Sequence, residues 1–134
     1  MPGNQRTVWV IGADHWTRAY LRAELIERGH DAVGFAATAD ALLRLALHRE
    51  RPALAVIDLH GQPPGPRKLG VLLHGGFPVL AIGGAVEWAT PSLAARPWAA
   101  RLHRPLTIGA IADEVERWLA GVTSLARAAP PEPH

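Results

Sequence analysis

The residues best suited to chemistry stand in four short segments, each directly after a run of apolar residues. These segments are Gly12-Ala13-Asp14-His15, Asp58-Leu59-His60, Gly83-Gly84 and Arg104-Pro105. The first two hold two carboxylates and two imidazoles, a ligand set that Zn²⁺ accepts. With seven histidines in the chain, some are expected beside carboxylates by chance, and we interpret His15 and His60 as exposed loop residues. We therefore predict no metal site.

Composition excludes several classes of protein. The chain of 134 residues is 49% hydrophobic, which suits one domain with a single core. The absence of cysteine excludes disulfides, thiolate metal sites and cysteine nucleophiles. No apolar stretch approaches the roughly 18 residues that a membrane span requires, so we expect a cytoplasmic protein without membrane contact. The formal net charge is only +2, without a long basic run, so we expect no direct nucleic-acid binding.

Short β-rich runs alternate with helical patterns along the chain. The predicted strands are Thr7–Ile11, Asp31–Phe35, Ala53–Ile57, Pro78–Ile82 and Trp98–His103. The predicted helix N-caps are Asp14, Thr38, Thr90 and Thr107. A further short helix is expected around Arg67–His74. This alternation predicts an α/β fold, a doubly wound parallel sheet of five strands with helices on both faces.

Two helices carry apolar residues at helical spacing, and we expect Trp118 on the stripe of the last helix to lie in the core. The stripe of the first helix is Trp16, Ala19, Tyr20, Ala23 and Ile26. The stripe of the last helix is Ile108, Ile111, Val115, Trp118 and Leu119. After Gly121 the sequence becomes TSLARAAPPEPH, so we divide the chain into a domain over residues 1–122 and a Pro-rich flexible tail or linker start over 123–134.

In an open parallel sheet, ligand or signal chemistry lies at the carboxyl ends of the strands. At those ends the chain resembles the receiver domain of bacterial two-component response regulators over residues 7–121. The matching features are Ile57-Asp58-Leu59 before a Pro/Gly-containing loop, Arg104-Pro105 after the fifth strand, Arg18 and Pro78-Val79. The resemblance implies a flavodoxin-like sheet with strand order 2-1-3-4-5, Asp58 at the phosphoacceptor position and a cis peptide bond before Pro105.

The other functional positions of a receiver do not match. Receivers carry an acidic pair after the first strand that holds Mg²⁺, and the matching residues are Gly12 and Ala13, with Asp14 one step further along. The positions of the switch hydroxyl, the switch aromatic and the lysine align with Gly83, Arg101 and Arg104. Because Mg²⁺ normally neutralises the phosphoryl oxygens, we expect weak or absent Mg²⁺ binding and an unphosphorylated Asp58, held by Arg104 or by loop amides.

Aromatic and arginine side chains gather around the predicted fourth helix and fifth strand. They are Trp88, Arg96, Trp98 and Arg101. In receivers the face made by helix four, strand five and helix five is the usual dimer and partner surface, and such residues are enriched at interface hot spots. The resemblance thus implies a protein partner or a homodimer through this face. An output domain after residue 134 and a free-standing adaptor are both left open.

We interpret the chain as an atypical receiver, or pseudo-receiver. It would act as a phosphorylation-independent protein-interaction module in signalling or transcriptional regulation, and not as an enzyme. One alternative is an unconventional receiver still phosphorylated on Asp58, with Asp14 or His15 supplying the missing ligand. The other is a small-molecule-sensing domain whose pocket is formed by Gly12–His15, Gly61–Gly65 and Gly83-Gly84.

Overall fold

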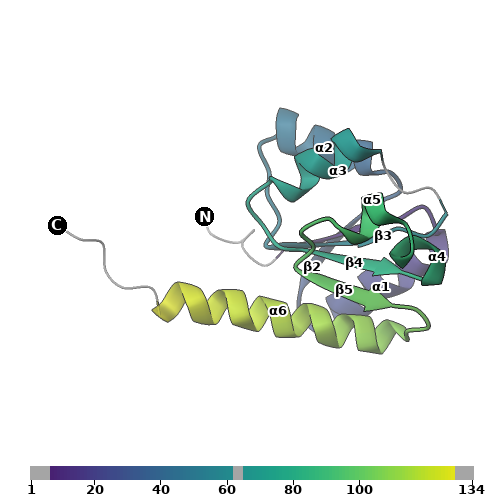
Figure 1. Cartoon of the computed structure of the whole chain (residues 1–134). Helices are drawn as coiled ribbons and strands as arrows, with labels where there is room; N and C mark the ends of the chain where they lie inside the picture. Colours follow the sequence, from purple (N-terminus) through teal and green to yellow (C-terminus); the bar gives the residue numbers. More distant parts are fainter. Residues whose placement is uncertain (1–6, 62–64, 129–134) are drawn as a thin grey trace.

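The structure is a computed structural model that describes residues 7–61 and 65–128, with side chains to residue 121. Its strands form one sheet in the order β2-β1-β3-β4-β5 with parallel pairing throughout (Figure 1). The strands are β1 (Thr7–Ile11), β2 (Asp31–Phe35), β3 (Leu54–Asp58), β4 (Val79–Gly83) and β5 (Ala100–His103). This sheet confirms the doubly wound fold and the strand order that we predicted from the sequence.

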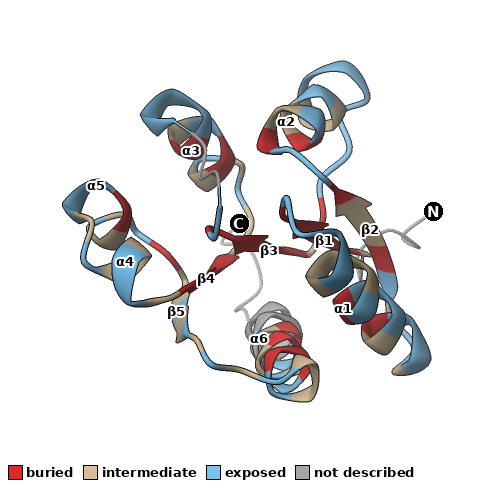
Figure 2. Ribbon diagram, turned by 90° about the vertical axis from the view of Figure 1, so that its right-hand side faces the viewer, coloured by how far each residue is buried: buried red, intermediate tan, exposed pale blue. Residues whose placement is uncertain are grey.

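Helices cover both faces of the sheet (Figure 2). They are α1 (His15–Glu27), α2 (Thr38–Leu47), α3 (Pro66–Leu73), α4 (Ala85–Trp88), α5 (Pro91–Ala94) and α6 (Ile108–Ala128). Within β1, Val8 and Val10 pack with residues of α1 and α6, whereas Trp9 and Ile11 pack with residues of α2, α3 and α5. Every residue of β3 and β4 is buried, because helices cover both sides of these central strands.

Two of the predicted helix caps are confirmed by side-chain hydrogen bonds. The Trp16 amide donates to Asp14 Oδ1 at 3.1 Å at the start of α1. The Ala110 amide donates to Thr107 Oγ1 at 3.0 Å at the start of α6. Both side chains satisfy first-turn amides that have no acceptor within the helix.

The prediction for Thr38 is wrong, and that for Thr90 holds only in position. Thr38 is the first residue of α2, and the N-cap is Ala37, which has no side chain that can accept a hydrogen bond. Thr90 is the N-cap of α5, but its hydroxyl donates to the Val86 carbonyl oxygen at 2.8 Å instead of capping an amide. The sequence analysis also missed α4, which lies between Gly84 and Thr90.

The apolar residues whose spacing predicted α1 do not form its core side. Trp16, Tyr20 and Ile26 are 63%, 57% and 48% exposed. The core side of α1 is instead formed by Leu21 and Leu25, which are fully buried and stand four residues apart. The indole of Trp16 stacks on the ring of Tyr20 with 5.8 Å between centroids, so two aromatic side chains share an exposed helix face.

Arginine side chains of α1 lie along β2. The Arg22 Nε donates to the Ala32 carbonyl oxygen at 2.8 Å. The aliphatic part of Arg18 lies so near Gly34 that a Cβ there would stand 3.2 Å from Arg18 Cγ. Long arginine stems can cover apolar backbone while the charged group reaches an acceptor, and they do so along this strand.

The last helix is longer than predicted. We expected it to end near Gly121, but α6 continues to Ala128 and extends past the sheet (Figure 1). The rest of the predicted tail, residues 129–134, lies outside the described residues. Within the part of the chain that the structure describes, no helix is long and apolar enough to cross a membrane.

Candidate functional site

The phosphoacceptor-position residue lies where the sequence analysis placed it. Asp58 is the last residue of β3 and only 8% exposed. In the parallel register it pairs with Ile82 of β4, one residue before Gly83, and Gly83 in turn pairs with His103 of β5. The sheet therefore brings Asp58, Gly83 and the residues after β5 to one edge, as a doubly wound fold requires.

The carboxylate of Asp58 is held on both sides. Arg104 Nη2 donates to Asp58 Oδ2 at 2.5 Å, and the His60 amide donates to Asp58 Oδ1 at 3.0 Å. The expectation that Arg104 or loop amides hold this carboxylate is confirmed, since both do. Arg104 Nε is buried and has no partner among the described residues, so only one arm of the guanidinium serves the ion pair. The peptide bond between Arg104 and Pro105 is cis, as the resemblance implies.

Close packing explains the glycine after β1. A Cβ at Gly12 would stand 3.1 Å from Asp58 Cβ, and the Gly12 carbonyl oxygen accepts a hydrogen bond from Arg18 Nη1 at 2.6 Å. A longer side chain at position 12 would have to displace Asp58. The next residue, Ala13, is exposed and carries no ligating atom. Neither residue can supply the carboxylate that a receiver places here.

Asp14 does not replace the missing carboxylates. Its Oδ1 accepts from the Trp16 amide, and its Oδ2 accepts from the Thr17 hydroxyl at 2.7 Å. The Thr17 hydrogen bond is the main cause that lowers the pKa of Asp14. Among residues 7–61 and 65–128, no three His, Cys, Asp or Glu side chains stand together as metal ligands. The residues present therefore do not fit the Mg²⁺ site of a receiver.

The position of the switch hydroxyl is filled by a side chain from the next helix. A Cβ built on Gly83 would stand 2.9 Å from Cε2 and Nε1 of Trp88. The Trp88 Nε1 donates to the Leu102 carbonyl oxygen of β5 at 3.2 Å. The indole ring thus occupies the space beside Gly83 and joins α4 to β5.

Arg101, at the position of the switch aromatic, is an exposed anchor. Its Nη2 donates to the carbonyl oxygens of Ala94 and Arg96, each at 2.9 Å, and its Nε also donates to Ala94 at 3.1 Å. These carbonyls lie at the carboxyl end of α5, where a cation is favoured by the helix dipole. Arg101 therefore ties β5 to α5, as Trp88 ties it to α4.

One of the predicted partner-surface residues is not on the surface. Trp98 is only 6% exposed, and its Nε1 donates to the Leu93 carbonyl oxygen at 2.7 Å. It lies in the core beneath α5 because its large ring fills the space between the sheet and this short helix. Trp88 and Arg96 are half-buried, whereas Arg101 is exposed. Sequence reasoning missed Val86 on α4, whose apolar side chain is 75% exposed.

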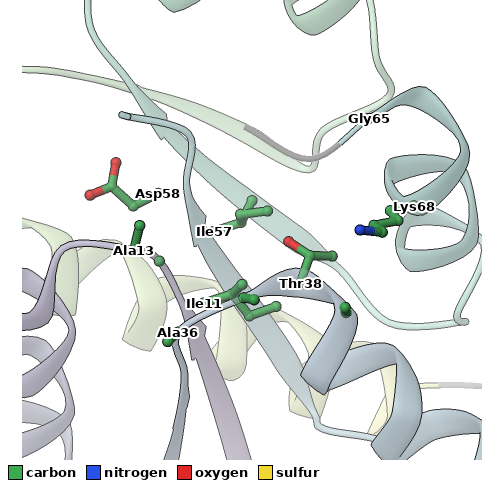
Figure 3. A pocket seen from close by; sticks show the side chains of 11 residues that line it. Ile11, Ala13, Ala36, Thr38, Ile57, Asp58, Gly65 and Lys68 are labelled. Atoms are coloured by element: carbon green, nitrogen blue, oxygen red, sulfur yellow. The ribbon is translucent and has the colours of Figure 1, made fainter. Parts of the chain in front are cut away.

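A cavity of about 250 Å³ opens between the ends of β1 and β3 and the beginnings of α2 and α3 (Figure 3). Its lining is Ile11, Gly12, Ala13, Ala36, Ala37, Thr38, Ala39, Ile57, Asp58, Gly65 and Lys68. Two of the three loops proposed for a small-molecule pocket contribute to it, while Gly83 and Gly84 do not. The sequence analysis missed Thr38 and Lys68 as site residues; the run of small residues from Ala36 to Ala39, directly after a strand, was the available signal.

Comparisons with known proteins agree on the fold. No protein-family model and no curated protein matches the chain. A response regulator receiver protein from Pseudomonas putida matches with 25% identity and a TM-score of 0.67, covering 83% of this chain and 95% of that one. A response regulator receiver protein from Burkholderia phymatum matches with 24% identity and a TM-score of 0.68, covering 85% and 94%.

A longer protein matches as well. NtrX from Brucella abortus, solved in complex with ATP, shows 20% identity and a TM-score of 0.70. The match covers 90% of this chain but 28% of NtrX, so the likeness concerns one part of that protein. Together with the strand order and the position of Asp58, these matches show that the chain has the fold of response regulator receiver domains.

Proposed function

We propose that this chain is a pseudo-receiver that works in the bacterial cytoplasm as a phosphorylation-independent protein-interaction module in signalling or transcriptional regulation. The observation that carries the proposal is the ion pair between Asp58 and Arg104, formed beside an Ala13 that cannot bind a metal. In this proposal the domain has no enzymatic activity and binds Mg²⁺ weakly or not at all.

Phosphoryl transfer to Asp58 would need positive charge beside its carboxylate. An aspartyl phosphate brings several negative oxygens to the end of a buried strand, and a divalent cation with carboxylate ligands normally offsets their charge. Here one arginine stands beside Asp58, and its charge is already paired with the existing carboxylate. Arg104 cannot take the place of a metal, because it carries a single positive charge on a planar group. A phosphoryl group on Asp58 would therefore lack sufficient compensation.

The contacts of β5 support a fixed conformation. In a switching receiver, the end of β4 and a residue of β5 rearrange when the phosphoryl group arrives. In this chain Trp88 fills the space beside Gly83, and Arg101 holds the end of α5. Both contacts join β5 to the neighbouring short helices without any bound group. We infer that the surface over α4, α5, β5 and α6 keeps one arrangement.

This surface is the proposed contact face for a protein partner or a second copy of the chain. Val86 on α4 and Arg101 on β5 are its exposed apolar and basic side chains. Arginine is enriched at interface hot spots, and an exposed apolar side chain such as Val86 adds area that a partner can bury. A chain that carries both this domain and an output domain would use the face internally; a separate chain would use it between molecules.

An amide NMR titration with Mg²⁺ followed by beryllofluoride tests phosphorylation independence. We expect no shifts at millimolar Mg²⁺ and none after beryllofluoride, a mimic of aspartyl phosphate. The control is A13D, which restores one carboxylate at an exposed position and should gain Mg²⁺-dependent shifts near Asp58. Shifts in the unmodified chain that start at Asp58 and reach Arg101 and α6 would overturn the proposal in favour of a working receiver.

A further inference from the structure

The cavity between α2 and α3 differs from the phosphoacceptor position in the charge that it presents. Figure 3 shows that the Asp58 carboxylate points away from Thr38 and Lys68. That carboxylate is already paired with Arg104. The side of the cavity opposite Asp58 is lined by the ammonium-bearing Lys68, the single lysine of the chain, and by Thr38. A negatively charged ligand on that side would lie near the Lys68 ammonium, while the Asp58 carboxylate is neutralised by Arg104.

The hydroxyl of Thr38 points into this cavity (Figure 3). Thr38 is 7% exposed, and its hydroxyl has no hydrogen-bond partner among the residues that the structure describes. The hydroxyl is not sealed inside the protein but is open to the cavity, where water or a ligand can bond to it. The open side of the Thr38 side chain is the cavity, and a ligand acceptor there would complete it.

Two helices begin at the same cavity without side-chain caps. The N-cap of α2 is Ala37 and the N-cap of α3 is Gly65, and neither supplies a capping oxygen. First-turn amides have no acceptor within a helix, and together they favour an anion at that end. The amides of Thr38 and Ala39 belong to the first turn of α2, and that of Lys68 belongs to the first turn of α3.

The size and lining of the cavity narrow the class of anion. A volume of about 250 Å³ is more than a lone phosphate ion fills. The remaining wall is apolar or small, with Ile11, Ala36 and Ile57 facing the space. Several donors at one end and an apolar wall at the other suit a phosphate group on a compact stem.

We propose that this cavity binds a small phosphate monoester, with its phosphate between the Thr38 hydroxyl, the Lys68 ammonium and the first-turn amides of α2 and α3. The ligand would lie on the α2 and α3 side of the sheet edge, and it does not require phosphorylation of Asp58. The bound phosphate would contact the first turns of both α2 and α3, so a small molecule could regulate the domain. The cavity is separate from the proposed contact face, which lies over α4, α5, β5 and α6.

The test is an amide NMR titration with glycerol 3-phosphate and, separately, with inorganic phosphate. We expect saturable shifts of the amides of Thr38, Ala39 and Lys68. The variants K68Q and T38V should each weaken binding by about tenfold, the effect of losing one hydrogen bond to a charged group. T38S keeps the hydroxyl and should bind like the unmodified chain.

Arg67 provides the matched control. It precedes Lys68 on the same exposed helix turn but does not line the cavity, so R67Q removes the same charge and should change binding by less than about twofold. Tighter binding of glycerol 3-phosphate than of phosphate would support a monoester, and equal binding of the two would overturn that assignment. Shifts without saturation, equal losses in R67Q and K68Q, or shifts centred on Arg104 that persist in K68Q would overturn the proposal.

Discussion

The indole of Trp88 lies where a side chain at position 83 would stand. A Cβ on Gly83 would approach two atoms of this ring to 2.9 Å, and the same ring donates a hydrogen bond to Leu102 of β5. Glycine and tryptophan therefore depend on one another: the bare backbone at 83 makes room for the ring, and the ring covers that backbone. A hydroxyl-bearing side chain at position 83 cannot be introduced without moving Trp88.

We predict that G83A destabilises the fold by about 1–3 kcal/mol, the usual result of adding a methyl group to a filled space. The Cβ would also stand 3.1 Å from Glu87 Cβ, so the added methyl group would crowd two residues of α4. Urea-induced unfolding followed by circular dichroism measures the difference.

The double variant G83A/W88A separates crowding from any other effect of the methyl group. With the ring removed, adding alanine at position 83 should change the free energy of unfolding much less than it does in the unmodified chain. An equal loss in both backgrounds would contradict the assignment of Trp88 as the residue that requires Gly83.

Arg104 is predicted to be the main electrostatic support of Asp58. R104M leaves a carboxylate whose side chain is only 5% exposed without its cation, and loss of one partner of a buried pair typically destabilises by about 3–5 kcal/mol. R104K should be milder, since lysine keeps the charge and removes the buried, unpartnered Nε of Arg104. Chemical denaturation at pH 7 measures both.

Two further variants give this prediction its controls. D58N removes the buried charge, so D58N/R104M should recover most of the stability that R104M loses. R117M breaks an ion pair with Glu114 whose arginine is 71% exposed, and it should change stability by less than about 1 kcal/mol. If R104M were as mild as R117M, the ion pair would not be what holds Asp58.

Sequence patterns located the sheet almost to the residue, because continuous apolar runs are required where a strand is covered on both faces. They also located Asp58 and its partner Arg104. They failed where the aliphatic part of an arginine packs against the sheet in place of an apolar side chain. On α1, Leu21 and Leu25 face the core while Arg18 and Arg22 pack along β2, an arrangement that apolar spacing alone does not indicate.

The candidate site was predictable only in part for a related reason. The absence of carboxylates at Gly12 and Ala13 is readable directly, whereas the role of Trp88 depends on contacts across two elements. A tryptophan beside a short helix is equally consistent with a partner surface and with the core, and Trp98 proved to be core. The small residues from Ala36 to Ala39 are a local signal for open space beside Thr38, but the part that Lys68 takes depends on how α2 and α3 are placed relative to one another.

Because Leu21 and Leu25 form the core side of α1, we can predict which substitutions in this helix destabilise the domain. L25A should destabilise the domain by about 2–5 kcal/mol, because Leu25 is fully buried against the sheet and α6. W16A should cost less than about 1 kcal/mol, because the ring is 63% exposed and its aromatic neighbours are the exposed rings of His15 and Tyr20. Thermal unfolding measured on both variants checks the assignment. The reverse order would contradict the assignment of Leu25 to the core side of α1.

Acid stability should depend on Glu116, which joins α6 to the end of α1. Its carboxylate accepts a hydrogen bond from Arg28 Nη1 at 2.7 Å and contacts His30 Nε2 at 3.1 Å. The pKa of Glu116 lies below its ordinary value of 4.5. The hydrogen bond with His30 lowers it most, and the hydrogen bond with Arg28 is the second cause. A lowered pKa in the folded state means that folding binds fewer protons.

The contribution of Glu116 is therefore complete above pH 4.5 and is lost as the pH falls through the lower pKa of the folded state. E116Q should be less stable than the unmodified chain at neutral pH and should lose less stability between pH 5 and pH 3. Urea unfolding midpoints across that range measure the slope. E114Q removes the same charge from the same helix but only from a pair with the exposed Arg117, so its slope should match that of the unmodified chain. Parallel slopes for E116Q and the unmodified chain would show that the contacts of Glu116 with Arg28 and His30 do not contribute to acid stability.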